Sequence, residues 1–341
     1  MQKKLICFFS TLCLTLPAFA NVEHIFGDDN RKSVYEVRDN LLKNAARATV
    51  MAVDKSYLQP LDNVGSKFKI FGYSYKKANK VCPGVKFEDE TATAFCSGFL
   101  VGPQTIITAG HCIGNDPANF CKDNTFVFDF GNFNGPKDLN FQKTGRDGWF
   151  LTGKVFTQNR EIYNCEKVLT YKNSSNHDYA IIKLKHAVID RVPMDYRSSG
   201  VVETRSQVAT IGFPSGLPMK VADEGRVIRH YGESTFSTSL DTFPGNSGGP
   251  VINQKTGIIE GIHVTGSVTT YIPGNSDCSV LAQSPEFGAQ VSYAGETKIT
   301  LISSIITDIL NGKEPSPIPE PTPTPKPKEP SSGSWGGRSK L

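Results

Sequence analysis

The sequence predicts an all-β protein in which two six-stranded antiparallel barrels flank a cleft. Three observations support this fold. The chain has 341 residues, enough for one large β domain with appendages. Its 31 glycines and 21 prolines punctuate many short apolar runs, a pattern that favours barrels over helices. Roughly a dozen such runs occur, which fits two barrels of six strands.

The first twenty residues have the pattern of an export signal. Lys3 and Lys4 precede an apolar stretch, and Ala18-Phe19-Ala20 offers the small residues of a cleavage site. The apolar stretch is too short to span a bilayer as a stable helix. We therefore expect a signal peptide over residues 1–20, a secreted or periplasmic location, and no stable membrane insertion.

Residues 21–45 are polar and charged, and two interpretations are open for them: a removable propeptide, as in a zymogen, or an ordered N-terminal arm. The β domain is expected over residues 46–312. In chain order its expected strands are Ala48–Val53, Lys67–Tyr73, Phe95–Val101, Thr105–Thr108, Thr125–Phe130, Tyr179–Leu184, Gln207–Phe213, Gly225–His230, Pro250–Asn253, Gly257–Val264 and Gly288–Tyr293.

A helix is expected at the end of the β domain, over residues 298–311, with Gly312 at its stop position. Its apolar residues cluster on one helical face: Ile299, Leu301, Ile302, Ile305, Ile306, Ile309 and Leu310. Residues 313–341 form a proline-rich segment whose composition cannot build a core, so we expect a disordered tail. A spacer and a wall-binding or sorting tail are both open interpretations.

Two distant strings carry the chemistry. His111 follows the strand-like run Ile106-Ile107-Thr108, and Ser247 lies in the glycine-rich turn Gly245-Asn246-Ser247-Gly248-Gly249-Pro250. Such a turn can expose a hydroxyl and aim two amide N–H groups the same way. A histidine that removes the serine's proton, together with an amide pair that holds an oxyanion, is the equipment of acyl-transfer hydrolysis.

Asp178 completes this set at the mouth of the expected strand Tyr179–Leu184. From there its carboxylate can accept the imidazole N–H and fix the tautomer that leaves the other nitrogen free to act as a base. Asp129 and Asp147 are alternative acids, but neither precedes so clear a strand.

On these residues, and over roughly positions 45 to 311, the chain resembles the trypsin/chymotrypsin-fold serine proteases, whose order of histidine, aspartate and serine it matches. The resemblance implies an endopeptidase that hydrolyses peptide bonds through an acyl-enzyme. It makes His111 the general base, Asp178 the orienting acid and Ser247 the nucleophile. Gly245 and Ser247 would supply the oxyanion-hole amides.

At two places the sequence departs from trypsin-like enzymes and is more similar to bacterial glutamyl endopeptidases. Asn246 stands where enzymes activated by a new N-terminal ammonium keep an aspartate, and it has no charge to receive that ammonium. Thr242 and His263 match positions that donate hydrogen bonds to a substrate carboxylate, which implies cleavage after Glu, with Asp second. Asp241 supports the alternative, cleavage after Lys or Arg, because trypsin-like enzymes keep their pocket acid six residues before the nucleophile.

Export permits disulfides, and removal of the signal leaves six cysteines with fifteen ways to pair. In the family, matching cysteines bridge beside the catalytic histidine, so Cys96 and Cys112 are the expected pair. Cys121 and Cys165 lie in the long segment between His111 and Asp178 and could staple it together. The partners of Cys82 and Cys278 stay open.

Other classes of function find less support. The net charge of +4 lies partly in the chain ends and forms no basic stripe with aromatics, so we expect no nucleic-acid binding. The sequence contains no metal-ligand, dinucleotide-binding or phosphate-binding motif, so we expect no metal and no cofactor. We expect a monomer that acts on polypeptide substrates.

An inactive homologue serving as a binding module is disfavoured by the complete triad. A periplasmic heat-shock protease would need a peptide-binding domain where the proline-rich tail follows.

Overall fold

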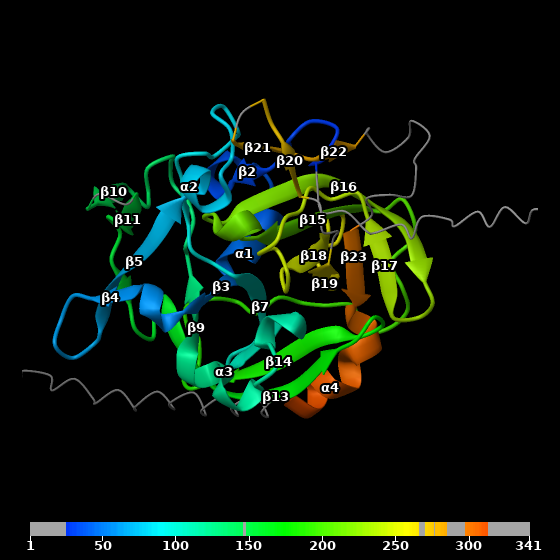
Figure 1. Ribbon diagram of the computed structural model, residues 1–341. Coiled ribbons are helices and arrows are strands. Elements are labelled where there is room, and N and C mark those ends of the chain that lie inside the picture. Colours follow the sequence, from blue (N-terminus) through cyan, green and yellow to red (C-terminus); the bar gives the residue numbers. More distant parts are fainter. Residues whose placement is uncertain (1–24, 146–147, 266–269, 276, 285–296, 313–341) are drawn as a thin grey trace, which may run out of the picture.

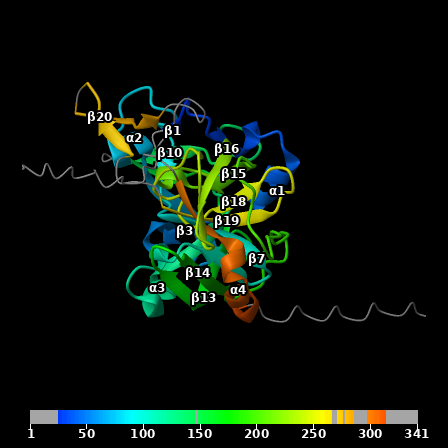
Figure 2. The ribbon, with the colours of Figure 1, turned by 90° about the vertical axis from the view of Figure 1, so that its right-hand side faces the viewer.

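The computed structural model describes residues 25–145, 148–265, 270–275, 277–284 and 297–312, and in these ranges two β-barrels lie against each other (Figures 1 and 2). The expected signal peptide, the expected strand Gly288–Tyr293 and the proline-rich tail lie outside the described residues. Within those ranges, no helix combines the length and the apolar character needed to cross a bilayer.

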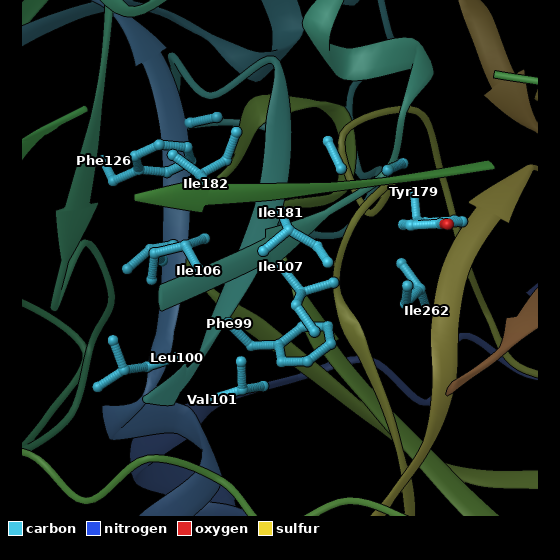
Figure 3. Close-up of a cluster of buried hydrophobic side chains, with 14 of the residues drawn as sticks. Phe99, Leu100, Val101, Ile106, Ile107, Phe126, Tyr179, Ile181, Ile182 and Ile262 are labelled. Carbon is cyan, nitrogen blue, oxygen red and sulfur yellow. The ribbon is translucent and has the colours of Figure 1, made fainter. Parts of the chain in front are cut away.

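The first barrel closes through six antiparallel strands in the order β13-β14-β8-β7-β3-β9. Their bounds are Thr49–Asp54 (β3), Cys96–Gly102 (β7), Thr105–Thr108 (β8), Asn124–Phe128 (β9), Ile162–Asn173 (β13) and Asp178–Leu184 (β14). The isoleucine pairs of β8 and β14 are buried on both faces of the sheet (Figure 3). One face fills the barrel, and the other meets Ile262 of the second barrel, so a single core joins the two.

The second barrel closes in the order β15-β18-β19-β23-β17-β16, with β16 pairing back to β15. Its strands are Gln207–Gly212 (β15), Lys220–Tyr231 (β16), Thr235–Thr238 (β17), Pro250–Asn253 (β18), Ile259–Thr265 (β19) and Thr297–Leu301 (β23). The prediction of two six-stranded antiparallel barrels is confirmed.

The remaining strands extend this frame. A separate small sheet is built around β5 and projects beside the first barrel, so the expected strand Lys67–Tyr73 lies outside both barrels (Figure 1). Its strands are Leu58–Pro60 (β4), Lys67–Ser74 (β5), Thr91–Ala92 (β6), Phe141–Thr144 (β10), Trp149–Thr152 (β11) and Phe156–Thr157 (β12). Short pairs add Ile25–Phe26 (β1) to Gln283–Ser284 (β22), Lys32–Ser33 (β2) to β16, and Tyr271–Pro273 (β20) to Ser279–Leu281 (β21).

The helices are short: Asn40–Arg47 (α1), Tyr75–Asn79 (α2), Pro117–Asp123 (α3) and Ile306–Gly312 (α4). The expected C-terminal helix exists, but its predicted start at residue 298 is wrong. Residues 297–301 form strand β23, which pairs with β17 on one side and with β19 on the other. Three of its five residues are β-branched, which favours a strand over a helix. A 3-10 turn, Ile302–Ile305, then leads into α4.

Three disulfides join the cysteines that remain after the expected signal. Cys96 pairs with Cys112, and Cys121 pairs with Cys165, as expected. Cys82 pairs with Cys278 and so links α2's neighbourhood to β21 across a sequence separation of 196 residues. Because this bridge closes a long stretch of chain, it restricts the unfolded chain most strongly.

Candidate active site

His111 is positioned by the turn that leaves β8. The backbone passes so close to β13 that a Cβ on Gly110 would lie 1.8 Å from the Lys172 carbonyl oxygen, so only glycine fits there. His111 then opens a 3-10 turn, His111–Ile113, at the edge of the first barrel. Cys112, in the same turn, is tied back to β7 by its disulfide with Cys96.

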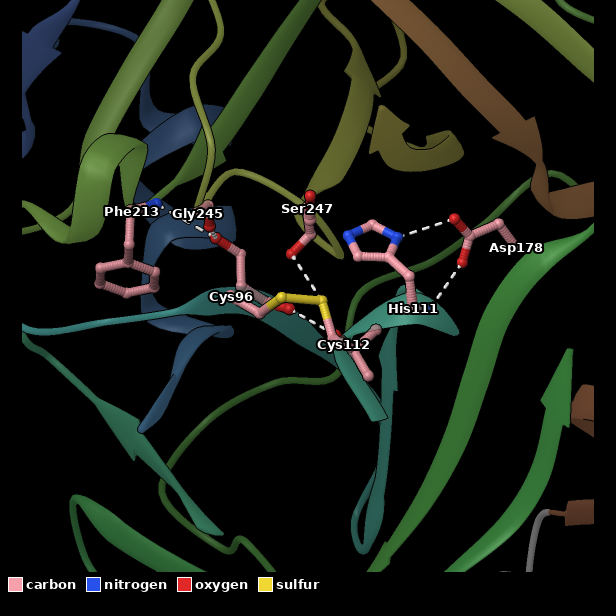
Figure 4. Close-up of a disulfide and its surroundings, with 9 residues drawn as sticks. Cys96, His111, Cys112, Asp178, Phe213, Gly245 and Ser247 are labelled. Atoms are coloured by element: carbon pink, nitrogen blue, oxygen red, sulfur yellow. Dashed lines mark hydrogen bonds and ion pairs between the residues drawn. A yellow bond between two sulfur atoms is a disulfide. The ribbon is translucent and has the colours of Figure 1, made fainter. Parts of the chain in front are cut away.

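Asp178 holds His111 with both of its carboxylate oxygens. One oxygen accepts the His111 backbone N–H at 2.9 Å, and the other lies 2.7 Å from the ring atom Nδ1 (Figure 4). The Thr300 hydroxyl lies 3.4 Å from the Asp178 nitrogen and 3.3 Å from its carbonyl oxygen. Strand β23 of the second barrel thereby holds the backbone of Asp178.

Ser247 stands in the turn before β18, and the His111 ring lies between it and Asp178 (Figure 4). The Ser247 carbonyl oxygen accepts the Ser97 N–H at 2.7 Å, which ties this turn to strand β7 of the first barrel. Among the described residues, no hydrogen bond joins the His111 ring to the Ser247 hydroxyl. Such bonds are often long without a substrate and tighten when one binds.

The turn before Ser247 is shaped by bonds to its carbonyl groups. The Pro244 oxygen accepts the Ser215 N–H at 2.5 Å, and the Gly245 oxygen accepts the Ser97 hydroxyl at 2.7 Å. In a trans peptide the C=O and N–H point in opposite directions, so the Gly245 N–H points away from Ser215. Gly245 has a φ of +101°, and a Cβ there would lie 2.4 Å from the Phe213 oxygen, so glycine is required.

These residues line one cleft of about 650 Å³ between the barrels. The first barrel contributes His111 and Asp178, and the second contributes Ser247, as the sequence predicts. The full lining is Phe95, Cys96, His111, Cys112, Asn173, Ser174, Ser175, Asp178, Pro244, Gly245, Ser247, Val264, Lys298 and Thr300.

The alternative acid Asp129 does not line this cleft. Asp129 is bonded to Arg191 at 3.0 Å and belongs to a buried ion-pair cluster elsewhere in the molecule. Asp147 lies outside the described residues. Between the two acids that the structure describes, Asp178 is therefore the one that it brings to His111.

The candidate pocket residues Thr242 and His263 are fully buried. The Thr242 hydroxyl lies 3.0 Å from the Thr297 hydroxyl, which faces it from β23. Burial, with a smaller contribution from the nearby His111, lowers the pKa of His263 to about 3, so its imidazole is neutral at neutral pH.

Asp241 is directed away from the cleft. Its carboxylate accepts the backbone N–H groups of Phe26 at 2.7 Å and Asn30 at 3.1 Å, and the residue is 1% exposed. Burial raises the pKa of Asp241 to about 7, although both amide bonds oppose the shift.

Two supporting residues were not anticipated from the sequence. The Ser97 hydroxyl bonds the Gly245 oxygen and also accepts the Phe213 N–H at 3.1 Å, and Thr300 bonds Asp178 as described above. Both are ordinary strand residues, far in sequence from their partners. Nothing in the local pattern distinguishes them from other buried hydroxyl side chains.

Comparison with known proteins shows that this chain is similar to peptidases. Residues 96–262 match the family model of the trypsin-like peptidase domain. Two curated relatives are each 27% identical: a Bacillus subtilis protein named extracellular metalloprotease, over 172 residues (49% of each chain), and a Bacillus licheniformis glutamyl endopeptidase, over 171 residues (47% of this chain and 46% of the relative). The chain thus spans about half the length of the curated relatives it matches.

Two solved protease structures are also similar to this chain. A Glu endopeptidase in complex with MPD has a TM-score of 0.46 at 15% identity, covering 84% of this chain and 97% of that chain. The Vibrio cholerae VesB protease has a TM-score of 0.46 at 13% identity, covering 82% of this chain and 66% of that one. From the family match over residues 96–262 and the two closed barrels, we conclude that this chain is a relative of the trypsin/chymotrypsin-fold serine proteases.

Proposed function

We propose that this peptidase is a serine endopeptidase that uses His111, Asp178 and Ser247. The observation that carries the proposal is the contact between the Asp178 carboxylate and His111 Nδ1 at 2.7 Å, on the side of the ring opposite to Ser247 (Figure 4). Asp178 would keep the proton on Nδ1, which leaves Nε2 as a base directed toward the serine.

In the proposed reaction, Nε2 of His111 takes the Ser247 proton while Oγ attacks the substrate carbonyl carbon. The resulting oxyanion would lie at the N–H groups of Gly245 and Ser247. Collapse of this intermediate expels the amine, which receives the proton from His111, and leaves an acyl-enzyme. Water, activated by the same histidine, then releases the acid and restores the serine.

A single substitution tests the catalytic assignment. Ser247→Ala removes the nucleophile and should lower peptide hydrolysis by on the order of 10⁶-fold, because nucleophile and base act as one unit. The melting temperature should stay close to that of the wild type, since Ser247 holds β7 through its carbonyl oxygen rather than its hydroxyl. A fluorophosphonate probe should label the wild type but not the variant. Undiminished hydrolysis by Ser247→Ala would rule out the assignment.

We further propose cleavage after Glu, with Asp second. The resemblance assigns Thr242 and His263 to a pocket that donates hydrogen bonds to a carboxylate, and one relative is named a glutamyl endopeptidase. The alternative of a Lys/Arg pocket is weakened because the Asp241 carboxylate is occupied by the amides of Phe26 and Asn30. A pocket of buried donors should reject side chains that leave those donors unpaired.

Digestion of a proteome-derived peptide library, read by mass spectrometry, tests this specificity. Cut sites should concentrate after Glu, and His263→Ala should lower kcat/KM for Glu substrates while leaving fluorophosphonate labelling of Ser247 largely intact. Cuts after Lys or Arg in the wild type would overturn the specificity but leave the catalytic assignment standing.

We also propose that the protein is exported and works as a monomer. Three disulfides support export, because such bonds persist in oxidising compartments. Secretion from cells that express the full chain, followed by N-terminal sequencing of the product, tests cleavage of the signal after residue 20. A product retained inside the cell with its N-terminus intact would contradict it.

A further inference from the structure

The segment of residues 25–33, here called the arm, packs against the nucleophile loop, residues 241–247. The arm begins with β1, which pairs with β22, and ends with β2, which adds to the edge of the second barrel beside β16 (Figure 1). Between these two anchors, the arm contacts the nucleophile loop at two points.

The first contact is made by Asp241, the first residue of the nucleophile loop. Its two carboxylate oxygens accept the N–H groups of Phe26 and Asn30, at 2.7 and 3.1 Å. Because Asp241 is 1% exposed, water cannot replace these donors without movement of the chain. A buried carboxylate without hydrogen-bond donors is strongly disfavoured, so Asp241 depends on the arm.

The second contact is made by Arg31, which is also 1% exposed. Its guanidinium lies 4.1 Å from the centre of the Phe243 ring, over the middle of the nucleophile loop. Asp29 holds the guanidinium in this plane through bonds to Nε at 2.9 Å and to Nη2 at 2.7 Å. A planar cation over an aromatic face is attractive, and the attraction is stronger where water is excluded.

The arm therefore holds residues 241 and 243, while Ser215 and Ser97 hold the carbonyl groups of Pro244 and Gly245. The loop is fixed on two sides immediately before the nucleophile. Asn246 cannot accept an N-terminal ammonium, as the related aspartate does in other enzymes. Here a different acid of the same loop, Asp241, accepts two neutral amide donors from the arm instead.

We propose that Asp241 and Arg31 are positioning residues through which the arm holds the nucleophile loop in the shape required by the Gly245 and Ser247 amides. This inference rests on the proposed function of those amides. It assigns residues 25–33 to the working enzyme rather than to a removable propeptide, and it gives Asp241 a role other than charge selection in the substrate pocket.

Two substitutions test the contacts separately, and a third serves as the matched control. Asp241→Asn keeps the shape, but its Nδ2 group is a donor and cannot accept the second amide. Arg31→Gln removes the stacked guanidinium. Lys32→Gln breaks an arm ion pair with Asp223, 2.8 Å long, that does not reach the nucleophile loop.

Steady-state kinetics at pH 8 on one peptide substrate should separate the three variants. Both loop-contact variants should lower kcat by about tenfold or more, toward the 10²–10³-fold cost of one lost oxyanion donor, with KM within about twofold. Lys32→Gln should match the wild type. Urea unfolding of each variant verifies that the comparison is made on folded protein. A kcat within twofold of the wild type for both Asp241→Asn and Arg31→Gln would overturn the proposal.

Amide hydrogen exchange provides a readout that does not depend on activity. In a Ser247→Ala background, peptides covering residues 241–247 should exchange faster with Asp241→Asn or Arg31→Gln, and not with Lys32→Gln. Unchanged exchange would overturn the positioning role even if the wild type is an active peptidase. Faster exchange in these variants, together with a wild type that hydrolyses no peptide, would support the positioning role and reject the proposed function. Selective loss of cleavage after Lys or Arg in Asp241→Asn would instead identify Asp241 as the pocket acid.

Discussion

At the scale of single residues, the site depends on close backbone approaches that only glycine permits. Gly110 and Gly245 each face a carbonyl oxygen at a distance where no Cβ fits. The sequence indicated the importance of the second through its glycine-rich turn, whereas Gly110 stood out only as a neighbour of His111. Gly110 must be glycine because the Lys172 carbonyl oxygen on β13 lies against it. No local sequence pattern connects these two residues.

Gly110→Ala should destabilise the fold and displace His111, because the new methyl group would lie 1.8 Å from a backbone oxygen that cannot rotate away. We expect a loss of several kcal/mol in the free energy of unfolding, at the high end for a single substitution. Gly135→Ala is the control, since a Cβ at Gly135 meets nothing within 4 Å. Equal unfolding midpoints in urea for the two variants would contradict this account.

Asp178→Asn should leave the fold intact but lower kcat by about 10⁴-fold, because the amide favours the wrong His111 tautomer. Asp129→Asn is the comparison: it breaks the ion pair with Arg191 and should reduce stability while sparing kcat. A similar loss of kcat in both variants would argue against a special role for Asp178.

At the scale of elements, the sequence predicted most strands of the two barrels, because alternation and turn residues mark them locally. Strands β13 and β17 were missed; β13 lies in the long segment between the histidine and aspartate motifs, where no strand after Thr125–Phe130 was expected. Strand β23 was mistaken for a helix, because Ile299 and Leu301 continue the apolar spacing of the residues after them. For β13 and β23, the segment becomes a strand because it pairs with neighbouring strands that are distant in the sequence. The periodicity of apolar residues within the segment cannot reveal those partners.

The Cys96–Cys112 disulfide clamps the β7–β8 hairpin that presents His111. Replacing both cysteines with alanine should lower the free energy of unfolding by about 3 kcal/mol in the chain-entropy model, because the bridge closes a short loop. It should also lower kcat, since the released turn carries His111, the proposed base. Non-reducing peptide mapping of the wild type should recover this pair. A free Cys96 or Cys112 there, or an unaffected kcat in the double variant, would contradict the clamp.

At the scale of the whole molecule, two buried groups with opposite pKa shifts, Asp241 and His263, contribute to the response of stability to pH. The pKa of Asp241 is raised from 3.8 to about 7, chiefly by burial, with Asp29 adding to the shift and Arg31 opposing it. The stabilisation that the buried Asp241 carboxyl adds to the free energy of unfolding is therefore fully present below about pH 4 and is lost as the pH rises to 7. The pKa of His263 is lowered from 6.5 to about 3, so its contribution is lost as the pH falls through that range.

Between about pH 4 and 6.5, rising pH weakens the contribution of Asp241 to stability and strengthens that of His263. The Asp241→Asn substitution removes the first of these contributions. The free energy of unfolding of the wild type minus that of this variant should fall by a few kcal/mol from pH 4 to 7.5. Urea titrations in the Ser247→Ala background measure it without self-digestion. The same difference for Lys32→Gln should change little. A difference for Asp241→Asn that is independent of pH would show that the buried carboxyl does not titrate as described.

The position of β23 also sets the order of events while the chain is being made. It comes after every other strand of both barrels, yet it closes the second barrel and carries the Thr300 hydroxyl that bonds Asp178. The histidine, the aspartate and the serine are all synthesised before it. A nascent chain that still lacks residues 297–301 therefore has neither the Thr300 hydroxyl at Asp178 nor a closed second barrel. If the proposed triad is the active site, peptide hydrolysis should therefore appear only after this strand has been synthesised.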